Sequence, residues 1–125
     1  MLAVTVKQLL PWACAATLAA HAAFLSAADA GRGQQLYESR CIGCHSIDDN
    51  RAGPAHKGVF GRKAGLAKGF DYSPAVKSSK LIWNERTLDR WLTNPEAAIP
   101  GNKMGFAVPD PIDRADLIEY LRTAK

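Results

Sequence analysis

The chain has few of the residues that form disulfides in small exported domains or bind structural metals. Its 125 residues include only three cysteines, three histidines and two methionines. Cys41 and Cys44 are two residues apart, and a disulfide that closes so short a loop constrains little of the unfolded chain. A structural zinc ion takes four Cys or His ligands, yet beyond residues 41–45 only His56 remains after residue 30. A stapling disulfide and a closed zinc site are therefore both poor explanations of the cysteine pair.

Strand patterns and internal repeats are also lacking. No run of Val, Ile or Thr alternates with polar residues, so a thioredoxin-like βαβ setting for the cysteine pair has no support. Residues 46–70 are rich in glycine, which indicates an irregular loop. Short helices are expected over 31–40, from Pro74, over 84–93, and from Pro111 toward the C-terminus. Helices this short are not stable alone in water, so we expect an all-α domain whose core is completed by a bound group.

Helix boundaries follow from the residues that flank these patterns. Ser73 precedes Pro74, a good first helical residue because its missing N–H is not needed there. Asn84 and Asp110 are the expected N-caps of the next two helices. Asn94-Pro95 is expected to end the helix over 84–93.

The first thirty residues are typical of a secretory signal. Lys7 is the only charged residue before Asp29, and residues 9–28 are almost entirely apolar or small. Ala28-Asp29-Ala30 has small residues at the spacing that signal peptidase accepts, and Ser26-Ala27-Ala28 is a second option. We therefore expect cleavage after Ala28 or Ala30, a mature domain over 31–125, and a bacterial periplasmic location. The alternative is a membrane anchor retained through residues 9–28, since about 20 residues can span a bilayer.

The segment Cys41-Ile42-Gly43-Cys44-His45 is the attachment pattern of c-type haem. Two thiols at this spacing can each add to one vinyl group of the same porphyrin. The histidine after the second cysteine is then held beneath the iron as its proximal ligand. The pattern predicts one covalently bound haem, with Cys41 and Cys44 as the attachment residues and His45 as a ligand.

Two residues compete for the sixth position of the iron. Met104 is the only methionine besides the initiator, and it follows the turn-prone residues 100–103. His56 is only eleven residues beyond His45, so its loop would have to round the porphyrin edge to reach the other face. We therefore expect Met104 to be the ligand, with His56 and an open position as the alternatives.

The ordered motifs along the chain resemble those of the class I cytochromes c, especially the mitochondrial type and its exported bacterial relatives. The resemblance covers essentially all of residues 31–125. It is carried by Gly33, Tyr37, 41–45, 53–54, 59–63, 70–73, Trp83, 87–88, 94–95, 99–104 and 114–121. It implies a small all-α fold of three to five short helices around one covalently bound haem.

The resemblance also implies roles for residues around the haem. The Pro54 carbonyl would accept a hydrogen bond from the proximal His45. Tyr72 and Trp83 match residues that hydrogen-bond a buried haem propionate, and Arg62 matches a nearby cation. Other matches are Phe106, which would pack beside the haem, and the crossing of the terminal helices, where Gly33 and Tyr37 would meet Leu117 and Tyr120.

The chain departs from the family pattern in three places. Trp91 replaces a tyrosine near the methionine sulfur, which puts a hydroxyl contact there in doubt. Val76 replaces an asparagine of the haem pocket. Residues 96–98 replace two lysines and a tyrosine, so the ring of lysines that faces partners is thinner here.

The function implied is outer-sphere transfer of single electrons, because iron with both axial positions filled has no place for a substrate. The chain carries a net charge of +4, and a basic rim would steer it to redox proteins with acidic docking patches. The candidates for this rim are Lys57, Lys63, Lys77, Lys80 and Lys103. We expect a monomer with transient membrane-complex contacts and no nucleic-acid partner. The alternatives are a haem enzyme or gas-binding protein with a labile sixth ligand, and a fixed subunit of a larger dehydrogenase or oxidase.

Covalent attachment gives the first prediction. If both cysteines form thioethers, extraction of the mature protein with acid and acetone should leave all of its haem on the polypeptide. The absorption spectra of the two phases measure the partition. Haem in the organic phase would contradict attachment.

Overall fold

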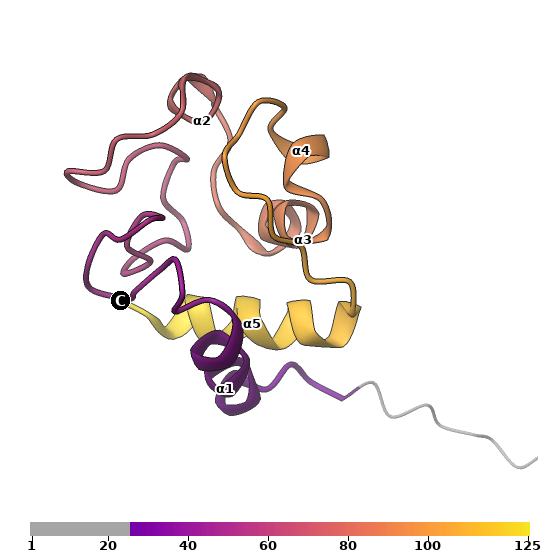
Figure 1. Ribbon diagram of the computed structural model, residues 1–125. Coiled ribbons are helices and arrows are strands. Elements are labelled where there is room, and N and C mark those ends of the chain that lie inside the picture. Colours follow the sequence, from indigo (N-terminus) through magenta and orange to yellow (C-terminus); the bar gives the residue numbers. More distant parts are fainter. Residues whose placement is uncertain (1–25) are drawn as a thin grey trace, which may run out of the picture.

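Five helices and the loops between them make up residues 26–125, the part of the chain that the computed structural model describes (Figure 1). The helices are α1 (Ala30–Arg40), α2 (Pro74–Ser78), α3 (Glu85–Thr93), α4 (Pro95–Ala98) and α5 (Pro111–Thr123). The sheet-like pairing in this part is one isolated antiparallel bridge between Lys63 and Ile82. The predicted all-α fold class is confirmed.

The predicted leader and anchor fall almost wholly outside the described residues. Of the leader, only its last residues, 26–30, are described, and Ser26 to Asp29 are exposed. No helix within residues 26–125 has both the length and the apolar character needed to cross a membrane.

Side-chain caps begin the helices where the sequence predicted them. The Ser73 hydroxyl accepts from the Val76 N–H at the start of α2. At the start of α3, Asn84 and Thr87 satisfy each other's backbone N–H groups through their side chains. Asp110 accepts from two N–H groups at the start of α5. Each cap satisfies donors that the first helical turn leaves free.

Helix α4 was not predicted, because Asn94-Pro95 was interpreted only as a stop. Asn94 is the C-cap of α3, and its own N–H donates to the Arg90 carbonyl at 3.1 Å. Its side chain also accepts from the Ala97 N–H at 3.1 Å, and Pro95 then begins a new turn. One residue therefore ends one helix and caps the next.

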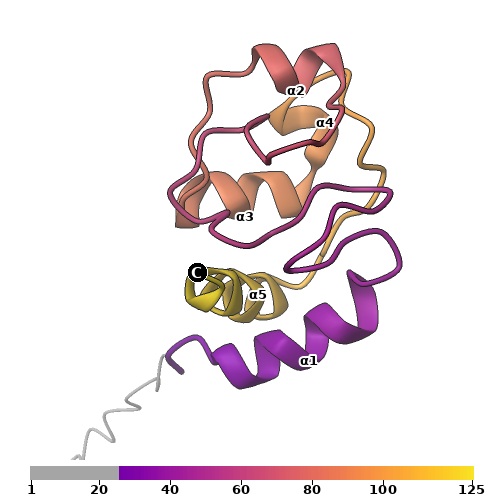
Figure 2. The same cartoon turned by 90° about the vertical axis from the view of Figure 1, so that its left-hand side faces the viewer.

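The two terminal helices cross in close contact, as Figures 1 and 2 show from two directions. Gly33 of α1 lies against the backbone of α5. A Cβ atom at this position would be only 2.0 Å from the Asp116 carbonyl oxygen and 2.9 Å from the Tyr120 Cβ. Tyr37 packs one turn further on, with its ring 5.3 Å from that of Tyr120. The expected crossing of the terminal helices is confirmed.

The buried core lies between α5, α3 and the long loops. Leu117, Ile118 and Leu121 of α5 meet Leu88 and Leu92 of α3 there. The loop between α1 and α2 closes one side of the core, and α3, α4 and the segment before α5 close the other (Figure 1).

A cluster of opposite charges locks the crossing of α1 and α5. Asp113 is buried, and its two carboxylate oxygens pair with Arg32 and Arg40 of α1. Arg32 also pairs with the buried Asp116. The hydrogen bond from Arg32 holds the pKa of Asp113 below its usual value, with a smaller contribution from Arg40.

The lowered pKa of Asp113 predicts how acid affects stability. A carboxyl whose pKa is lower in the folded chain stabilises the fold fully above its unfolded pKa of about 3.9, and loses this effect as the pH falls through the folded value. Asp113→Asn should therefore lower the melting temperature of the native protein near pH 7.

The difference in melting temperature between parent and variant should narrow below about pH 4. Both arginines are about half exposed, so solvent screening moderates the effect. Thermal melts from pH 7 to pH 2.5 measure it, and a difference that stays constant over this range would contradict the prediction.

Candidate functional site

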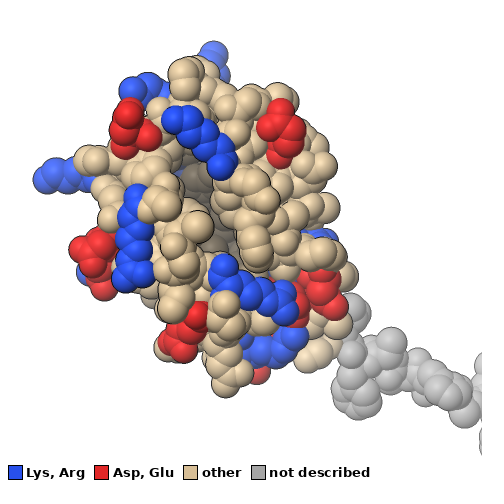
Figure 3. Space-filling model, in the orientation of Figure 1, with Lys and Arg blue, Asp and Glu red and all other residues tan. Residues whose placement is uncertain are grey.

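A cavity of about 580 Å³ opens into the middle of the domain. Its size falls within the range of cofactor pockets, roughly 300–1,000 Å³. Figure 3 shows the hollow from outside, with basic side chains on several sides of its mouth. The lining comes from α1, the loop after it, α3, the segment around Met104, and α5. Mostly apolar and aromatic side chains form the walls.

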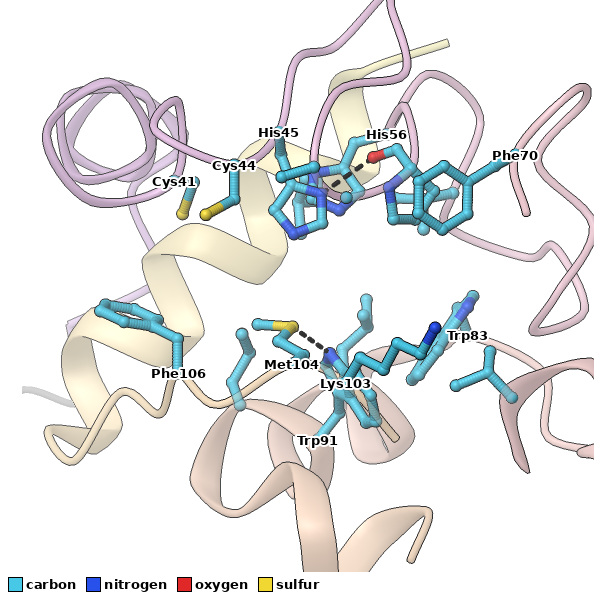
Figure 4. Close-up of a pocket in the computed structure, with 18 of the residues that line it drawn as sticks. Cys41, Cys44, His45, His56, Phe70, Trp83, Trp91, Lys103, Met104 and Phe106 are labelled. Atoms are coloured by element: carbon cyan, nitrogen blue, oxygen red, sulfur yellow. Dashed lines mark hydrogen bonds between the residues drawn. The ribbon is translucent and has the colours of Figure 1, made fainter. Parts of the chain in front are cut away.

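One wall holds the cysteine pair. The chain leaves α1 in a tight turn, in which the N–H groups of Cys44 and His45 both donate to the Cys41 carbonyl, at 3.1 and 2.8 Å. Both cysteines are free thiols that line the cavity, and their sulfur atoms point the same way (Figure 4). Burial raises the pKa of the Cys41 thiol to about 11.

His45 extends this wall and is held in one orientation. Its Nδ1 lies 2.9 Å from the Pro54 carbonyl oxygen. A carbonyl can only accept, so Nδ1 carries the proton and Nε2 of the neutral ring keeps a free lone pair. Gly53 packs against the ring, and a Cβ there would be only 2.2 Å from the His45 Cε1. Burial lowers the pKa of His45, and the Pro54 hydrogen bond opposes this in part.

His56 lies on the same wall, behind His45. The two imidazole rings are stacked, with centroids 4.1 Å apart and planes inclined by 21°. The His56 Nδ1 lies 3.0 Å from the Tyr37 hydroxyl oxygen. Burial lowers the pKa of His56 to about 3, with smaller contributions from the charges of His45 and Arg62. Its ring is therefore an uncharged packing partner of His45.

Met104 lies on the opposite wall, facing Cys41, Cys44 and His45 across the cavity (Figure 4). Hydrogen bonds within its loop hold it there. The Met104 N–H donates to the Asn102 side chain at 2.7 Å. Gly101 takes a φ of +85°, which suits glycine, and its N–H donates to Glu96 at 3.0 Å. Glu96, one of the departures from the family pattern, therefore steadies the loop before Met104.

The indole of Trp91 supports Met104 from behind. Its Nε1–H donates to the Met104 sulfur over a distance of 3.1 Å (Figure 4). The sequence predicted only that a hydroxyl contact was in doubt here. The structure supplies a different donor, because residue 91 on α3 faces the loop around Met104. In the sequence, Trp91 stands at helical spacing with Leu88 and Leu92, and nothing there distinguishes a donor to the Met104 sulfur from an ordinary core residue.

Polar groups of aromatic and basic side chains lie at the far end of the cavity. Arg62 donates from its two terminal nitrogens to the carbonyls of Lys57 and Ala55, at 2.9 and 3.0 Å. Its Nε is buried and has no partner within the described residues. Tyr72 accepts from the Ala67 N–H at 3.0 Å, which leaves its own hydroxyl proton free. The buried Trp83 lines the same end.

Phe106 lies at the cavity's edge on the same side as the cysteines (Figure 4) and is 44% exposed. The structure thus gathers around one cavity every site residue that the sequence nominated: Cys41, Cys44, His45, Pro54, Arg62, Tyr72, Trp83, Met104 and Phe106. His56 joins them behind His45.

Comparison with known proteins assigns the family. The family model for cytochrome c matches residues 30–125. The chain is 43% identical to cytochrome c of Euglena viridis, over 78% of this chain and 98% of the relative. It is 42% identical to cytochrome c2 of Rhodomicrobium vannielii, over 86% of this chain and 89% of the relative.

The structure is also similar to a solved one, cytochrome cH from Methylobacterium extorquens. The TM-score is 0.73 at 41% identity, and the match covers 76% of this chain and 98% of the other. The chain belongs to the cytochrome c family. It is a c-type electron carrier with one covalently bound haem, for which Cys41 and Cys44 provide the attachment motif.

The residues of the cavity fit this group. The two thiols point into it beside His45, whose Nε2 is available to a metal. Apolar walls suit the porphyrin. The buried Nε of Arg62, unpaired within residues 26–125, suits an acidic substituent, because a buried donor without a partner is costly.

Proposed function

We propose that this cytochrome c carries electrons on a haem whose iron His45 and Met104 would hold. One observation carries the proposal: the imidazole of His45 and the sulfur of Met104 face each other from opposite walls of one cavity (Figure 4). When bound, the haem supplies the one-electron couple of its iron. The chain supplies the ligands, their orientation and a surface for partners.

His45 and Met104 are oriented by different neighbours. The Pro54 carbonyl fixes the His45 ring through Nδ1, which directs Nε2 into the cavity and increases its basicity as a ligand. His56 and Gly53 restrict rotation of the ring from behind. As a ligand, Met104 would offer a soft thioether, which would favour the ferrous state and raise the reduction potential. Trp91 draws electron density from the same sulfur through its N–H.

Arg62, Tyr72 and Trp83 are the groups that we assign to a haem propionate. A buried carboxylate needs donors or a positive charge nearby. The Arg62 Nε, the free hydroxyl proton of Tyr72 and the indole of Trp83 line one end of the cavity. These groups support placing the negative end of the cofactor there, away from the cysteines. Phe106 shields the other edge.

The cavity mouth is the surface that we assign to electron transfer. Arg40 and Lys103 line the cavity, and basic side chains flank its opening (Figure 3). Such a surface steers encounters with acidic partners, in a manner that salt weakens. We propose transient complexes with soluble or membrane-bound redox proteins of an exporting bacterium, with the carrier monomeric in the periplasm after removal of its leader.

Met104→Ala tests the sixth ligand. It should abolish the near-infrared absorption band of the iron–thioether bond and lower the reduction potential. Carbon monoxide should then bind the reduced protein, and peroxidase turnover should rise, because a coordination position has opened. Optical spectra, potentiometry and carbon monoxide titration measure these effects.

His56→Leu is the matched control, since it removes the imidazole and keeps an apolar side chain behind His45. It should retain the thioether band and exclude carbon monoxide. A parent protein without the thioether band, a His56 variant that loses the parent's ligation and a Met104→Ala spectrum identical to the parent's would together replace the proposal with bis-histidine ligation. A parent protein that binds carbon monoxide readily would favour a haem enzyme or gas-binding protein.

Trp91→Phe tests the hydrogen bond to the ligand sulfur, because it keeps the aromatic ring and removes the N–H. The sulfur should then donate more to the iron, and the reduction potential should fall by about 20–60 mV. That range corresponds to a net hydrogen bond of about 0.5–1.5 kcal/mol for a one-electron couple. The variant should keep the thioether band, which shows that Met104 still holds the iron, so the change in potential is read with the ligand pair intact. An unchanged potential in Trp91→Phe would contradict this role.

A further inference from the structure

Asp29 lies between the predicted leader and α1, and its side chain, its carbonyl and its N–H all form hydrogen bonds with the fold. Its side chain caps α1 by accepting from the N–H groups of Gly31 and Arg32, at 2.8 and 3.1 Å. Its carbonyl accepts from the Gly33 N–H at 2.9 Å. Its own N–H donates to the Asp116 carboxylate on α5 at 2.7 Å. Residues 26–28, immediately before it, are exposed.

The carboxylate that faces this N–H is buried and only partly matched in charge. Asp116 is 4% exposed and pairs with Arg32. Asp113 pairs with Arg32 and Arg40. Together with Asp29, this hydrogen-bonded set holds three carboxylates and two guanidinium groups. A third positive charge at the Asp29 nitrogen would balance the set.

We propose that the leader is cleaved between Ala28 and Asp29, and that the new α-amino group of Asp29 pairs with Asp116. Signal peptidase adds water across the Ala28–Asp29 peptide bond, leaving a carboxylate on Ala28 and an ammonium group on Asp29. The ammonium then occupies the position of the N–H that already faces Asp116. The inference rests on the proposed export of the protein.

The other predicted cleavage position, after Ala30, removes what α1 needs. It would take away Asp29, and with it the side-chain cap, the carbonyl that accepts from Gly33 and the contact with Asp116. It would also remove Ala30, the first residue of α1. The four N–H groups of the first helical turn would then have only water to accept their hydrogen bonds. Cleavage after Ala28 keeps all of these bonds.

One effect opposes a positive charge here. The N-terminus of a helix carries a partial positive charge, which an ammonium group nearby would repel. The Asp29 carboxylate lies at the same position and offsets this repulsion. A charge-assisted bond from an ammonium to a buried carboxylate is also stronger than one from a neutral amide. Processing should therefore stabilise the crossing of α1 and α5.

The first test is the intact mass of the haem-containing protein recovered from an exporting bacterial host. A mass for residues 29–125 plus one haem supports the inference. A cleaved chain that begins at Gly31, or at any residue other than Asp29, overturns the inference but leaves the proposed export standing. A chain that still carries its whole leader overturns the inference and the proposed processing together.

The second test is a thermodynamic cycle on the haem-loaded protein. The chain beginning at Asp29 is compared with a matched chain that carries Ala27-Ala28 before it, each with Asp116 or with Asp116→Asn. With Asp116 present, the chain that begins at Asp29 should have a melting temperature about 4–8 °C above that of the chain with Ala27-Ala28. This difference between the two chains should vanish when both carry Asp116→Asn. An equal difference in both pairs would overturn the contact.

If Asp116→Asn does not fold, acetylation of the Asp29 amine in the parent replaces it. The acetylated chain should have the same melting temperature as the Ala27-Ala28 chain, since both lack a positive charge at the Asp29 nitrogen. A melting temperature unchanged by acetylation would overturn the pairing with Asp116.

Discussion

The close contact between Gly33 and the backbone of α5 is the packing on which the arrangement of the site depends. Without a side chain at residue 33, α1 lies directly on the Asp116 carbonyl. That contact fixes the direction in which α1 ends, and the turn from Cys41 to His45 follows at once from its last residues. The same crossing aligns Arg32 and Arg40 with the buried Asp113 and Asp116. The close helix contact and the ion pairs together thus fix the wall of the cavity that holds Cys41 and Cys44.

The two walls of the cavity are built in different ways. The wall with His45 is local, because Gly53 and Pro54 lie within ten residues of that ring and hold it by steric contact and one hydrogen bond. The wall with Met104 depends on groups from separate elements. Glu96 on α4 steadies Gly101, and Trp91 on α3 donates to the sulfur. We infer that the methionine side is the easier one to alter without changing haem attachment.

Burial of polar groups around the cavity follows one physical rule. A buried donor or acceptor is costly unless it has a partner. Almost every buried side-chain polar atom in residues 26–125 has one, and the exception, Arg62 Nε, lies at the end of the cavity that we assign to a propionate. His56, buried without charge, instead packs its ring against His45 and shares a hydrogen bond with Tyr37.

The sequence by itself determined the family, the covalent haem, the all-α fold class and the caps at Ser73, Asn84 and Asp110. The haem-attachment motif and the caps depend on residues that are adjacent or within one helical turn, and the family and fold class follow from the order of such short motifs along the chain. Only the tertiary structure decided that Asn94 begins α4 as well as ending α3, because a helix-stop pattern does not reveal a second capping bond. It alone paired Trp91 with Met104, stacked His56 on His45 and set Asp29 against Asp116. Partners that are 11 to 87 residues apart meet only when the helices pack, and no local pattern encodes that distance.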